Sequence, residues 1–253
     1  MDQYSDETRL MWNRVADDWD RQVGDDGDSN RILNSDPVLW QFVGDVAGIT
    51  ILDAGCGTGY LSRKLHDRGA HVLGIDFSEE MIRIARSKAA HIDFRIDSIS
   101  ELHTVTDGSI DIVISNYVLM DTPDLTATVQ AFFRVLKPGG YGVVVFSHPC
   151  FPQEYATGTD SDVAVTYQWN FPYFQQQKCV GPPWGHFTSE FIWFHRPLSD
   201  YWKAFRKSGF EVVDFEEPRL SEERYHLAKN ERQLNNGKNR PYSVAFKLQK
   251  REQ

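Results

Sequence analysis

Short apolar runs alternate with amphipathic segments along residues 49–148 of the chain. Each run is too short for a helix, and in the segment that follows it the apolar residues recur at helical spacing. Nearly continuous apolar strands separated by helices are typical of a parallel sheet with helices on both faces. The pattern therefore predicts a doubly wound α/β fold with strands at residues 49–55, 71–78, 92–98, 109–117 and 141–148.

Helical spacing and capping residues mark the intervening segments. Ser78 precedes a helix whose first turn is acidic, so it is expected to cap that helix. Gly69 follows the last periodic residue of the helix before it, as glycine often does. The stretch PGG at 138–140 is expected to break the chain before the fifth strand. The predicted helices cover residues 6–23, 38–46, 59–69, 78–89, 124–136 and 197–210.

The chain after the fifth strand has two different parts. Residues 211–217 and 242–249 read as two more strands, joined by a polar segment at 221–241, and they complete a mostly parallel seven-stranded sheet. Residues 149–196 instead crowd aromatic side chains among prolines and glycines, which predicts a cap inserted after the fifth strand. Its aromatic residues are Phe151, Tyr155, Tyr167, Trp169, Phe171, Tyr173, Phe174, Trp184, Phe187, Phe191, Trp193 and Phe194.

Composition and charge exclude several classes of protein. The 253 residues carry a net charge of -9 and form no obvious basic face, so nucleic acid is not an expected partner. No run approaches the roughly 20 apolar residues of a membrane helix, and the polar N-terminus resembles no targeting signal. Three cysteines without a CxxC pair are expected to be reduced thiols, which indicates a cytoplasmic protein. No cluster has the spacing of metal ligands, so no metal is expected.

The stretch ILDAGCGTGY at residues 51–60 joins the first strand to its helix. Glycines leave the backbone bare, so a ligand can approach it closely, and the amides of the following helix favour an anion. A dinucleotide fold requires G-x-G-x-x-G, but Tyr60 stands where its third glycine would be. A nicotinamide-dependent oxidoreductase is therefore kept only as an alternative.

The form D-x-G-x-G-x-G, which begins at Asp53, resembles the first motif of class I S-adenosylmethionine-dependent methyltransferases that act on small molecules. VLKPGG at 135–140 matches the turn that this family has before its fifth strand. The resemblance covers residues 10–148 closely and 197–250 in outline. It implies a Rossmann-like methyltransferase fold, with S-adenosyl-L-methionine as cofactor and S-adenosyl-L-homocysteine as product.

The resemblance gives roles to residues at the ends of the next two strands. Asp76 ends the second strand about 20 residues after the loop, where a carboxylate can accept hydrogen bonds from ribose hydroxyls. Asp97 ends the third strand and is expected to accept from the adenine amino group. The backbone amides of Ser98 and Ile99 are expected to meet the adenine ring nitrogens.

Other side chains are expected to enclose the cofactor. Phe77 and Met81 would flank the adenosine. WNRVADDWD at 12–20 resembles the W-x-x-x-A-x-x-Y-D lid helix of the family, with Trp19 where tyrosine is usual, so a ring wall is expected there.

The methionine part of the cofactor is expected at the end of the fourth strand, beside Asn116 and Tyr117. Arg31 could pair with its carboxylate, because a guanidinium suits that geometry. The expected cofactor-binding residues are Trp12, Trp19, Arg31, Asp53, Gly55, Cys56, Gly57, Gly59, Asp76, Phe77, Met81, Asp97, Ser98, Ile99, Asn116 and Tyr117.

The resemblance divides one domain into N-terminal lid helices (1–48), a cofactor-binding core (49–148), a substrate cap (149–196) and a C-terminal helix with two strands (197–253). The methyl acceptor is expected to be a small aromatic or lipophilic molecule that reacts at O, N or C. His148 and His195 are the candidate bases, because histidine is the usual proton acceptor near neutral pH.

Three alternatives stay open beside this one. They are methyl transfer to RNA or protein, the oxidoreductase, and a non-catalytic cofactor-binding subunit. A monomer or a homodimer is expected.

Overall fold

The fold is taken from a computed structural model. Two aromatic residues of the expected cap, Tyr155 and Trp169, lie outside the residues that it describes. The described residues are 3–151, 156–157, 166–167 and 171–252.

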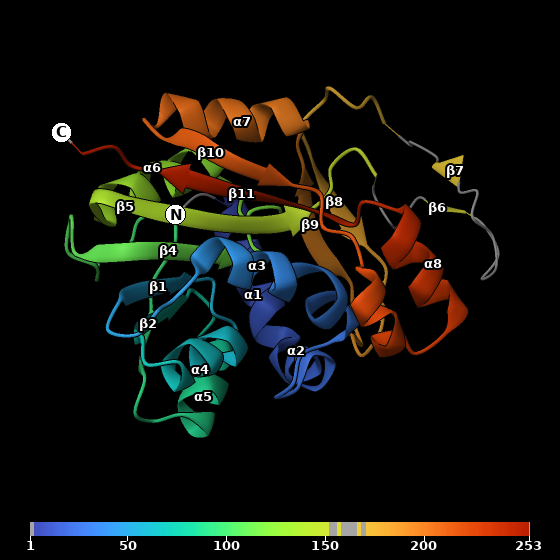
Figure 1. The fold of residues 1–253 in the computed structure, drawn as a ribbon, viewed down its shortest axis with the longest axis horizontal. Helices are drawn as coiled ribbons and strands as arrows, with labels where there is room; N and C mark the ends of the chain where they lie inside the picture. The colour runs from blue at the N-terminus through green and yellow to red at the C-terminus, as the bar shows by residue number, and fades with distance from the viewer. Residues whose placement is uncertain (1–2, 152–155, 158–165, 168–170, 253) are drawn as a thin grey trace.

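A seven-stranded sheet forms the centre of the molecule (Figure 1). Its order is β10-β11-β5-β4-β1-β2-β3, and only β11 runs antiparallel to its neighbours. This confirms the predicted fold class. The strands are β1 Thr50–Ala54, β2 His71–Asp76, β3 Asp93–Ile96, β4 Ile110–Asn116, β5 Leu136–Ser147, β10 Glu211–Glu216 and β11 Ser243–Gln249.

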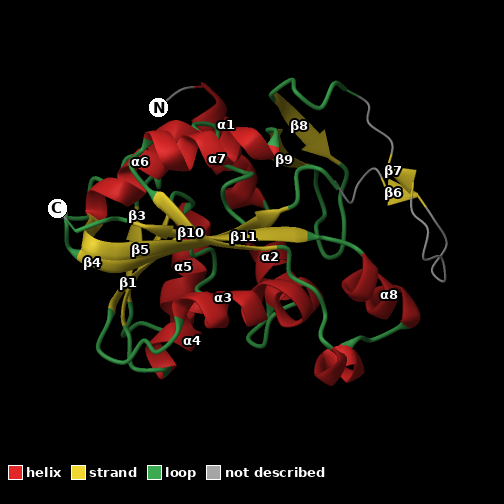
Figure 2. Ribbon diagram, turned by 45° about the horizontal axis from the view of Figure 1, so that its top comes forward, coloured by secondary structure: helices red, strands yellow, loops and turns green. Residues whose placement is uncertain are grey.

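Helices cover both faces of the sheet (Figure 2). One apolar cluster joins β1 to α3 (Asp36–Val43), α4 (Tyr60–Asp67) and α5 (Glu79–Lys88). A second cluster on the other face joins the sheet to α6 (Leu125–Val135) and α7 (Leu198–Lys207). Apolar residues alternate between the two faces of each strand, so both sides of the sheet are buried.

The predicted helix over 6–23 is two helices, α1 (Gln3–Arg14) and α2 (Ala16–Val23), with Val15 between them. Val15 packs with Phe187 in a cluster under the cap, whereas Ala16 packs with Met81 of α5. The helix is interrupted at Val15, whose φ of -100° and ψ of 10° lie outside the helical range.

The insertion after β5 forms a hairpin from β8 (Gln177–Gly181) and β9 (Phe191–His195). Two short strands, β6 (Ala156–Thr157) and β7 (Thr166–Tyr167), also pair within the insertion. Because β9 packs against α1, the hairpin and the N-terminal helices lie together beside the sheet.

Three element boundaries differ from the predictions. The polar segment 221–241 contains the 3-10 helix η3 (Glu222–Leu227) and helix α8 (Glu231–Asn239). Strand β5 begins at Leu136 rather than after PGG, because Leu136 pairs with Ile110 before a register shift. Helix α3 ends at Val43, where Gly44 has a φ of 73°. None of the described helices has both the length and the apolar character to cross a membrane.

Candidate functional site

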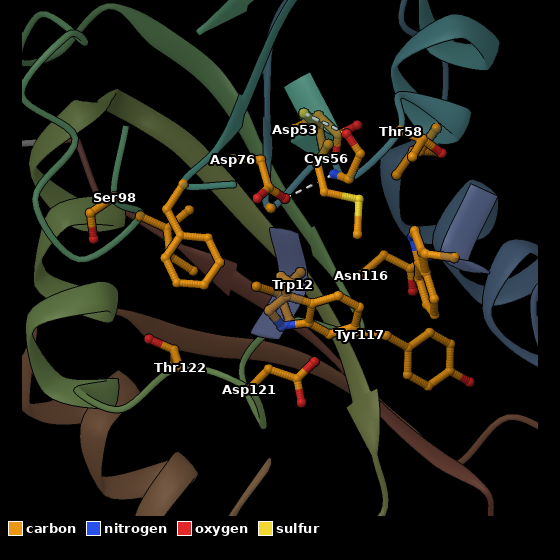
Figure 3. A pocket seen from close by; sticks show the side chains of 18 of the residues that line it. Trp12, Asp53, Cys56, Thr58, Asp76, Ser98, Asn116, Tyr117, Asp121 and Thr122 are labelled. Atoms are coloured by element: carbon orange, nitrogen blue, oxygen red, sulfur yellow. Dashed lines mark hydrogen bonds between the residues drawn. The ribbon is translucent and has the colours of Figure 1, made fainter. Parts of the chain in front are cut away.

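A cleft opens at the carboxyl ends of β1 and β4, where the strand order reverses direction. Ligands of doubly wound folds bind at this switch point. Most of the expected cofactor residues line the cleft (Figure 3). They are Trp12, Trp19, Arg31, Asp53, Gly55, Cys56, Gly57, Asp76, Phe77, Met81, Ser98, Ile99, Asn116 and Tyr117.

The glycine loop has a left-handed backbone, with a φ of 81° at Gly55 and 53° at Gly57. A Cβ on Gly55 would lie 2.5 Å from Val118 Cγ2, and one on Gly57 would lie 3.0 Å from Trp19 Nε1. Both conformation and space therefore require glycine, because a side chain would displace the loop after β4 or the indole wall.

Gly59 is not among the residues that line the cleft. It precedes α4 with a φ of 79°, and its Cβ would lie 2.9 Å from Phe94 Cζ and 3.2 Å from Ala85 Cβ. The structure therefore places this glycine where α4 approaches the sheet closely, which is the role of the third glycine in dinucleotide folds.

Asp76 ties two loops of the cleft together. Its Oδ2 accepts from Gly57 N at 3.0 Å, and its Oδ1 accepts from Ser78 N at 2.9 Å. Burial raises the pKa of Asp76 to about 6, against the effect of these hydrogen bonds. The carboxyl thus fixes the glycine loop and still faces the cleft.

Asp53 lies beneath the same loop and is only 2% exposed. Ser62 Oγ donates to its Oδ2 at 2.6 Å. Burial raises the pKa of Asp53 to about 6, with the Ser62 hydrogen bond opposing the shift and the charge of Asp76 adding to it. The folded chain thus holds two carboxyls at the base of the cleft whose pKa values lie above the usual range for aspartate.

We expect Asp53→Asn to change how stability depends on pH. The pKa of Asp53 is about 6 in the folded chain and 3.8 in the unfolded chain, so the folded wild type is destabilised as pH rises through this window. Relative to the variant, the wild type should lose about 2–3 kcal/mol of unfolding free energy between pH 4 and pH 7.5. Urea unfolding at both pH values measures this difference.

Asp111→Asn is the matched control for this experiment. Burial raises the pKa of Asp111, but hydrogen bonds from Lys137 and Thr50 outweigh it and lower that pKa. The free energy of unfolding of the wild type, relative to that of Asp111→Asn, should therefore increase with pH. The same pH trend in both variants would contradict the assignment of Asp53.

Arg31 lies at the other end of the cleft and is 6% exposed. Its Nη1 pairs with Asp28 Oδ1 at 3.1 Å. Aromatic rings surround the guanidinium, with ring centroids 4.8 Å away at Trp19 and 5.8 Å away at Tyr117. A further carboxylate could pair here, because rings do not replace the bidentate contact that arginine makes with carboxylates.

Asn116 places an acceptor at the same end. Its Nδ2 donates to Ser35 Oγ at 3.4 Å, in the π-helical turn η1 (Arg31–Ser35). Its Oδ1 is buried and has no hydrogen-bond partner among the described residues. Buried polar atoms are normally paired, so this atom indicates a missing donor. Together Arg31 and Asn116 complement the carboxylate and the ammonium group of an amino acid.

The opposite end of the cleft differs from the expectation at one residue. Ser98 and Ile99 line the cleft, but Asp97 does not. The Asp97 carboxylate accepts from Ser98 N at 2.8 Å and from Thr104 N at 2.7 Å. In this structure the carboxylate organises the loop after β3, so its contact with adenine stays a prediction.

Neither His148 nor His195 is among the residues that line the cleft. Nδ1 of His148 accepts from Cys150 N at 3.1 Å and its Nε2 donates to Glu217 Oε1 at 2.8 Å, so both ring nitrogens are occupied. His195 Nε2 donates to the carbonyl of Tyr173 at 2.7 Å. His148 N donates to the carbonyl of Tyr242, so the residue after β5 continues the ladder with β11.

Burial lowers the pKa of both histidines. The structure therefore does not bring the two predicted bases to the cleft.

Residues that the sequence analysis did not select also line the cleft. Asp121, Thr122, Pro123 and Asp124 lie between β4 and α6, and Ser5 belongs to α1. One feature of the sequence could have indicated this loop, because it directly follows the fourth strand, at whose end the methyl group is expected.

Comparison with known proteins identifies the family. Residues 45–179 match the family model of the methyltransferase domain, which is more than half of the chain. A demethylmenaquinone methyltransferase of Lactococcus lactis is 30% identical over 229 residues, which are 81% of this chain and 82% of that protein. The chain belongs to the methyltransferase domain family.

Two further relatives support this methyltransferase assignment. A ubiquinone biosynthesis O-methyltransferase of Xanthomonas oryzae is 36% identical over 122 residues, covering 46% of this methyltransferase and 51% of the relative. An S-adenosylmethionine-dependent methyltransferase of Mesorhizobium loti has a TM-score of 0.71 and 25% identity, covering 89% of this methyltransferase and 100% of that chain.

These comparisons confirm the expected family, enzyme class and cofactor. This methyltransferase is an S-adenosylmethionine-dependent enzyme, which sets aside the oxidoreductase and the non-catalytic subunit.

Proposed function

We propose that this methyltransferase transfers a methyl group to an O, N or C nucleophile of a small aromatic or lipophilic molecule. The main support for this proposal is the similarity, over four fifths of both chains, to an enzyme named for demethylmenaquinone. The shorter similarity to a ubiquinone biosynthesis enzyme points to the same class of acceptor. A substituted quinol ring is therefore the first acceptor to test.

The aromatic wall of the cleft supports an acceptor with a planar ring. Trp12 and Trp19 line the cleft with ring centroids 5.4 Å apart. Phe187 of the cap lies 6.2 Å from Trp12 and 5.9 Å from Trp19. Such clusters present large apolar faces to a flat ligand at little entropic cost.

The same proposal assigns cofactor contacts to this chain. Arg31 holds the carboxylate of the methionine part and Asn116 Oδ1 accepts from its ammonium group. Asp76 accepts from the ribose hydroxyls, Phe77 and Met81 flank the adenosine, and Ser98 and Ile99 face the adenine. The cofactor supplies an already electrophilic methyl group, so the chain has to orient the acceptor, exclude water and remove a proton.

The N-terminal helices and the cap are positioned to exclude water. Asp18 of α2 accepts from Thr188 N at 2.8 Å and from Thr188 Oγ1 at 2.7 Å in the hairpin. Lys178 of β8 pairs with Glu7 of α1 at 2.5 Å. We propose that this pair of elements forms the acceptor side of the site, with residues 1–48 as the lid and 149–196 as the substrate cap.

We also propose a cytoplasmic monomer or homodimer. The cysteines support the compartment, because Cys56 and Cys150 are free thiols.

Methyl transfer from labelled S-adenosylmethionine tests the acceptor class. The purified enzyme is incubated separately with reduced demethylmenaquinone, a small-molecule extract, total RNA and total protein. We expect label in the reduced quinone or in the small-molecule extract. Label that enters only RNA or protein would refute the proposed acceptor and favour the macromolecular alternative.

A further inference from the structure

The loop after β4 is held rigidly by the cap. Phe194 N donates to the carbonyl of Met120 at 2.7 Å. The buried guanidinium of Arg196 donates to the carbonyls of Leu119, Thr122 and Pro123 at 3.3, 2.6 and 2.7 Å. Four hydrogen bonds from one short segment therefore fix the backbone on both sides of Asp121.

Asp121 presents a carboxyl group to the cleft. It is among the lining residues, and no hydrogen bond to its side chain is found within the described part of the chain. Figure 3 shows it on the side of the cleft that faces Asp53 and Asp76. A carboxyl fixed in a cleft without a protein partner is available to a ligand.

Asp121 lies a few residues after the end of β4, where the reacting methyl group is expected. Asn116 and Tyr117 end β4, and Val118 touches the glycine loop at Gly55. Asp121 follows three residues later, and its backbone N–H donates to the carbonyl of Val118 at 2.8 Å. The carboxyl therefore belongs to the turn that closes over the strand end where the sulfonium and the acceptor are expected to meet.

Several titratable groups surround this carboxyl. Arg196 comes from the segment after β9, Tyr201 comes from α7, and Asp124 lines the same cleft and caps α6 through Ala127 N. Asp53 and Asp76 lie across the cleft at its base. Burial raises the pKa of Asp121 well above its usual range, and the charge of Arg196 opposes this only in part. A positive charge placed beside such a carboxyl favours its ionised form.

We propose that Asp121 is the catalytic residue that accepts the proton of the acceptor's nucleophile, and that it ionises when the cationic cofactor occupies the cleft. This inference rests on the proposed function. As the nucleophile bonds to the methyl carbon, the carbon–sulfur bond breaks and its electron pair returns to sulfur. The proton lost by the nucleophile goes to the Asp121 carboxylate and then to solvent.

The inference narrows the acceptor class. A base is required only where the nucleophile carries a proton at the working pH, as a phenolic or enolic hydroxyl does. A carboxylate acceptor has no such proton. The site therefore suits a hydroxyl-bearing ring.

Calorimetry with S-adenosylmethionine and S-adenosylhomocysteine tests the inference without an acceptor. Each nucleoside is titrated into the full chain in buffers of different ionisation enthalpy between pH 5.5 and 7.5. The wild type should release more protons with the sulfonium than with the thioether, because only the sulfonium carries the charge that ionises Asp121. In Asp121→Asn this difference should fall to what Asp53 and Asp76 contribute. In Asp111→Asn, whose carboxyl lies outside the cleft, it should stay as in the wild type.

Turnover gives the second readout. With reduced demethylmenaquinone, kcat of the wild type should rise with pH, and Asp121→Asn should lose about 100-fold or more of kcat together with this pH dependence.

The outcomes separate this inference from the proposed function. Equal proton release with both nucleosides in the wild type, or a difference that is undiminished in Asp121→Asn, would overturn the role of Asp121 and leave the cofactor site intact. No binding of either nucleoside would overturn the proposed cofactor site and the inference together.

Discussion

Gly57→Val is expected to abolish binding of S-adenosylmethionine, with an affinity loss of at least about 100-fold. The φ of 53° at Gly57 strains a branched residue by about 1–3 kcal/mol. In addition, the new Cβ would lie 3.0 Å from Trp19 Nε1 and push the indole from the wall of the cleft. Calorimetric titration of the variant with the cofactor measures the loss.

Gly108→Val separates backbone strain from loss of the site. Gly108 has a similar φ of 60°, and a Cβ there would have no heavy atom within 4 Å. It lies before β4, at the opposite edge of the sheet from the cleft. This variant should lose stability and keep its cofactor affinity; equal losses of affinity in both variants would show that Gly57 acts only through folding.

Asp76→Ala is expected to weaken cofactor binding by about 1–3 kcal/mol, which is roughly 5- to 150-fold. The variant loses the carboxylate proposed to accept from the ribose hydroxyls. It also releases Gly57 N and Ser78 N, so the loop that faces the cofactor loses its anchor. Titration with S-adenosylhomocysteine, the neutral product, keeps the comparison free of charge effects.

Asp111→Ala is the matched control for Asp76→Ala. Asp111 also accepts from a backbone amide, that of Thr50 at 3.0 Å, but at the amino edge of the sheet. Its loss should lower the free energy of unfolding without changing the affinity. Wild-type affinity in Asp76→Ala would contradict the ribose assignment.

The sheet could be predicted because its strands are buried on both faces. Ile51, Leu52 and Ile114 are fully buried, and such strands appear in the sequence as short uninterrupted apolar runs. Ser78 was found for a similarly local reason: its Oγ accepts from Met81 N within the same turn. Features that depend on neighbours in sequence are therefore visible without the structure.

Elements without an apolar stripe could not be predicted. Helix α8 buries only Asn236 and Gly237, so its sequence has no hydrophobic period. The interruption at Val15 leaves the helical spacing intact, because it changes the backbone angles of one residue while α1 and α2 both still pack against α5.

The site residues also divide into those that the sequence predicts and those that depend on distant segments. Asp76 and Asn116 stand at strand ends in one sheet, so topology alone brings them to one cleft. The position of His148 depends on segments that follow much later in the chain: its backbone pairs with Tyr242 next to β11, and its ring is bonded to Glu217 after β10. Asp121 was missed because its exposure to the cleft depends on the hydrogen bonds of Arg196.

The hydrogen bonds from Phe194 and Arg196 to the loop after β4 affect how relatives of this enzyme can differ in their acceptor. The strand that supplies Phe194, and Arg196 just beyond it, belong to the cap that surrounds the acceptor, yet both also hold the turn that carries Asp121. Substitutions that reshape this cap for a new acceptor therefore also move the proton acceptor. The choice of acceptor and the removal of its proton therefore depend on the same segment. Relatives with a different acceptor should differ both in the cap and in the turn that corresponds to Asp121.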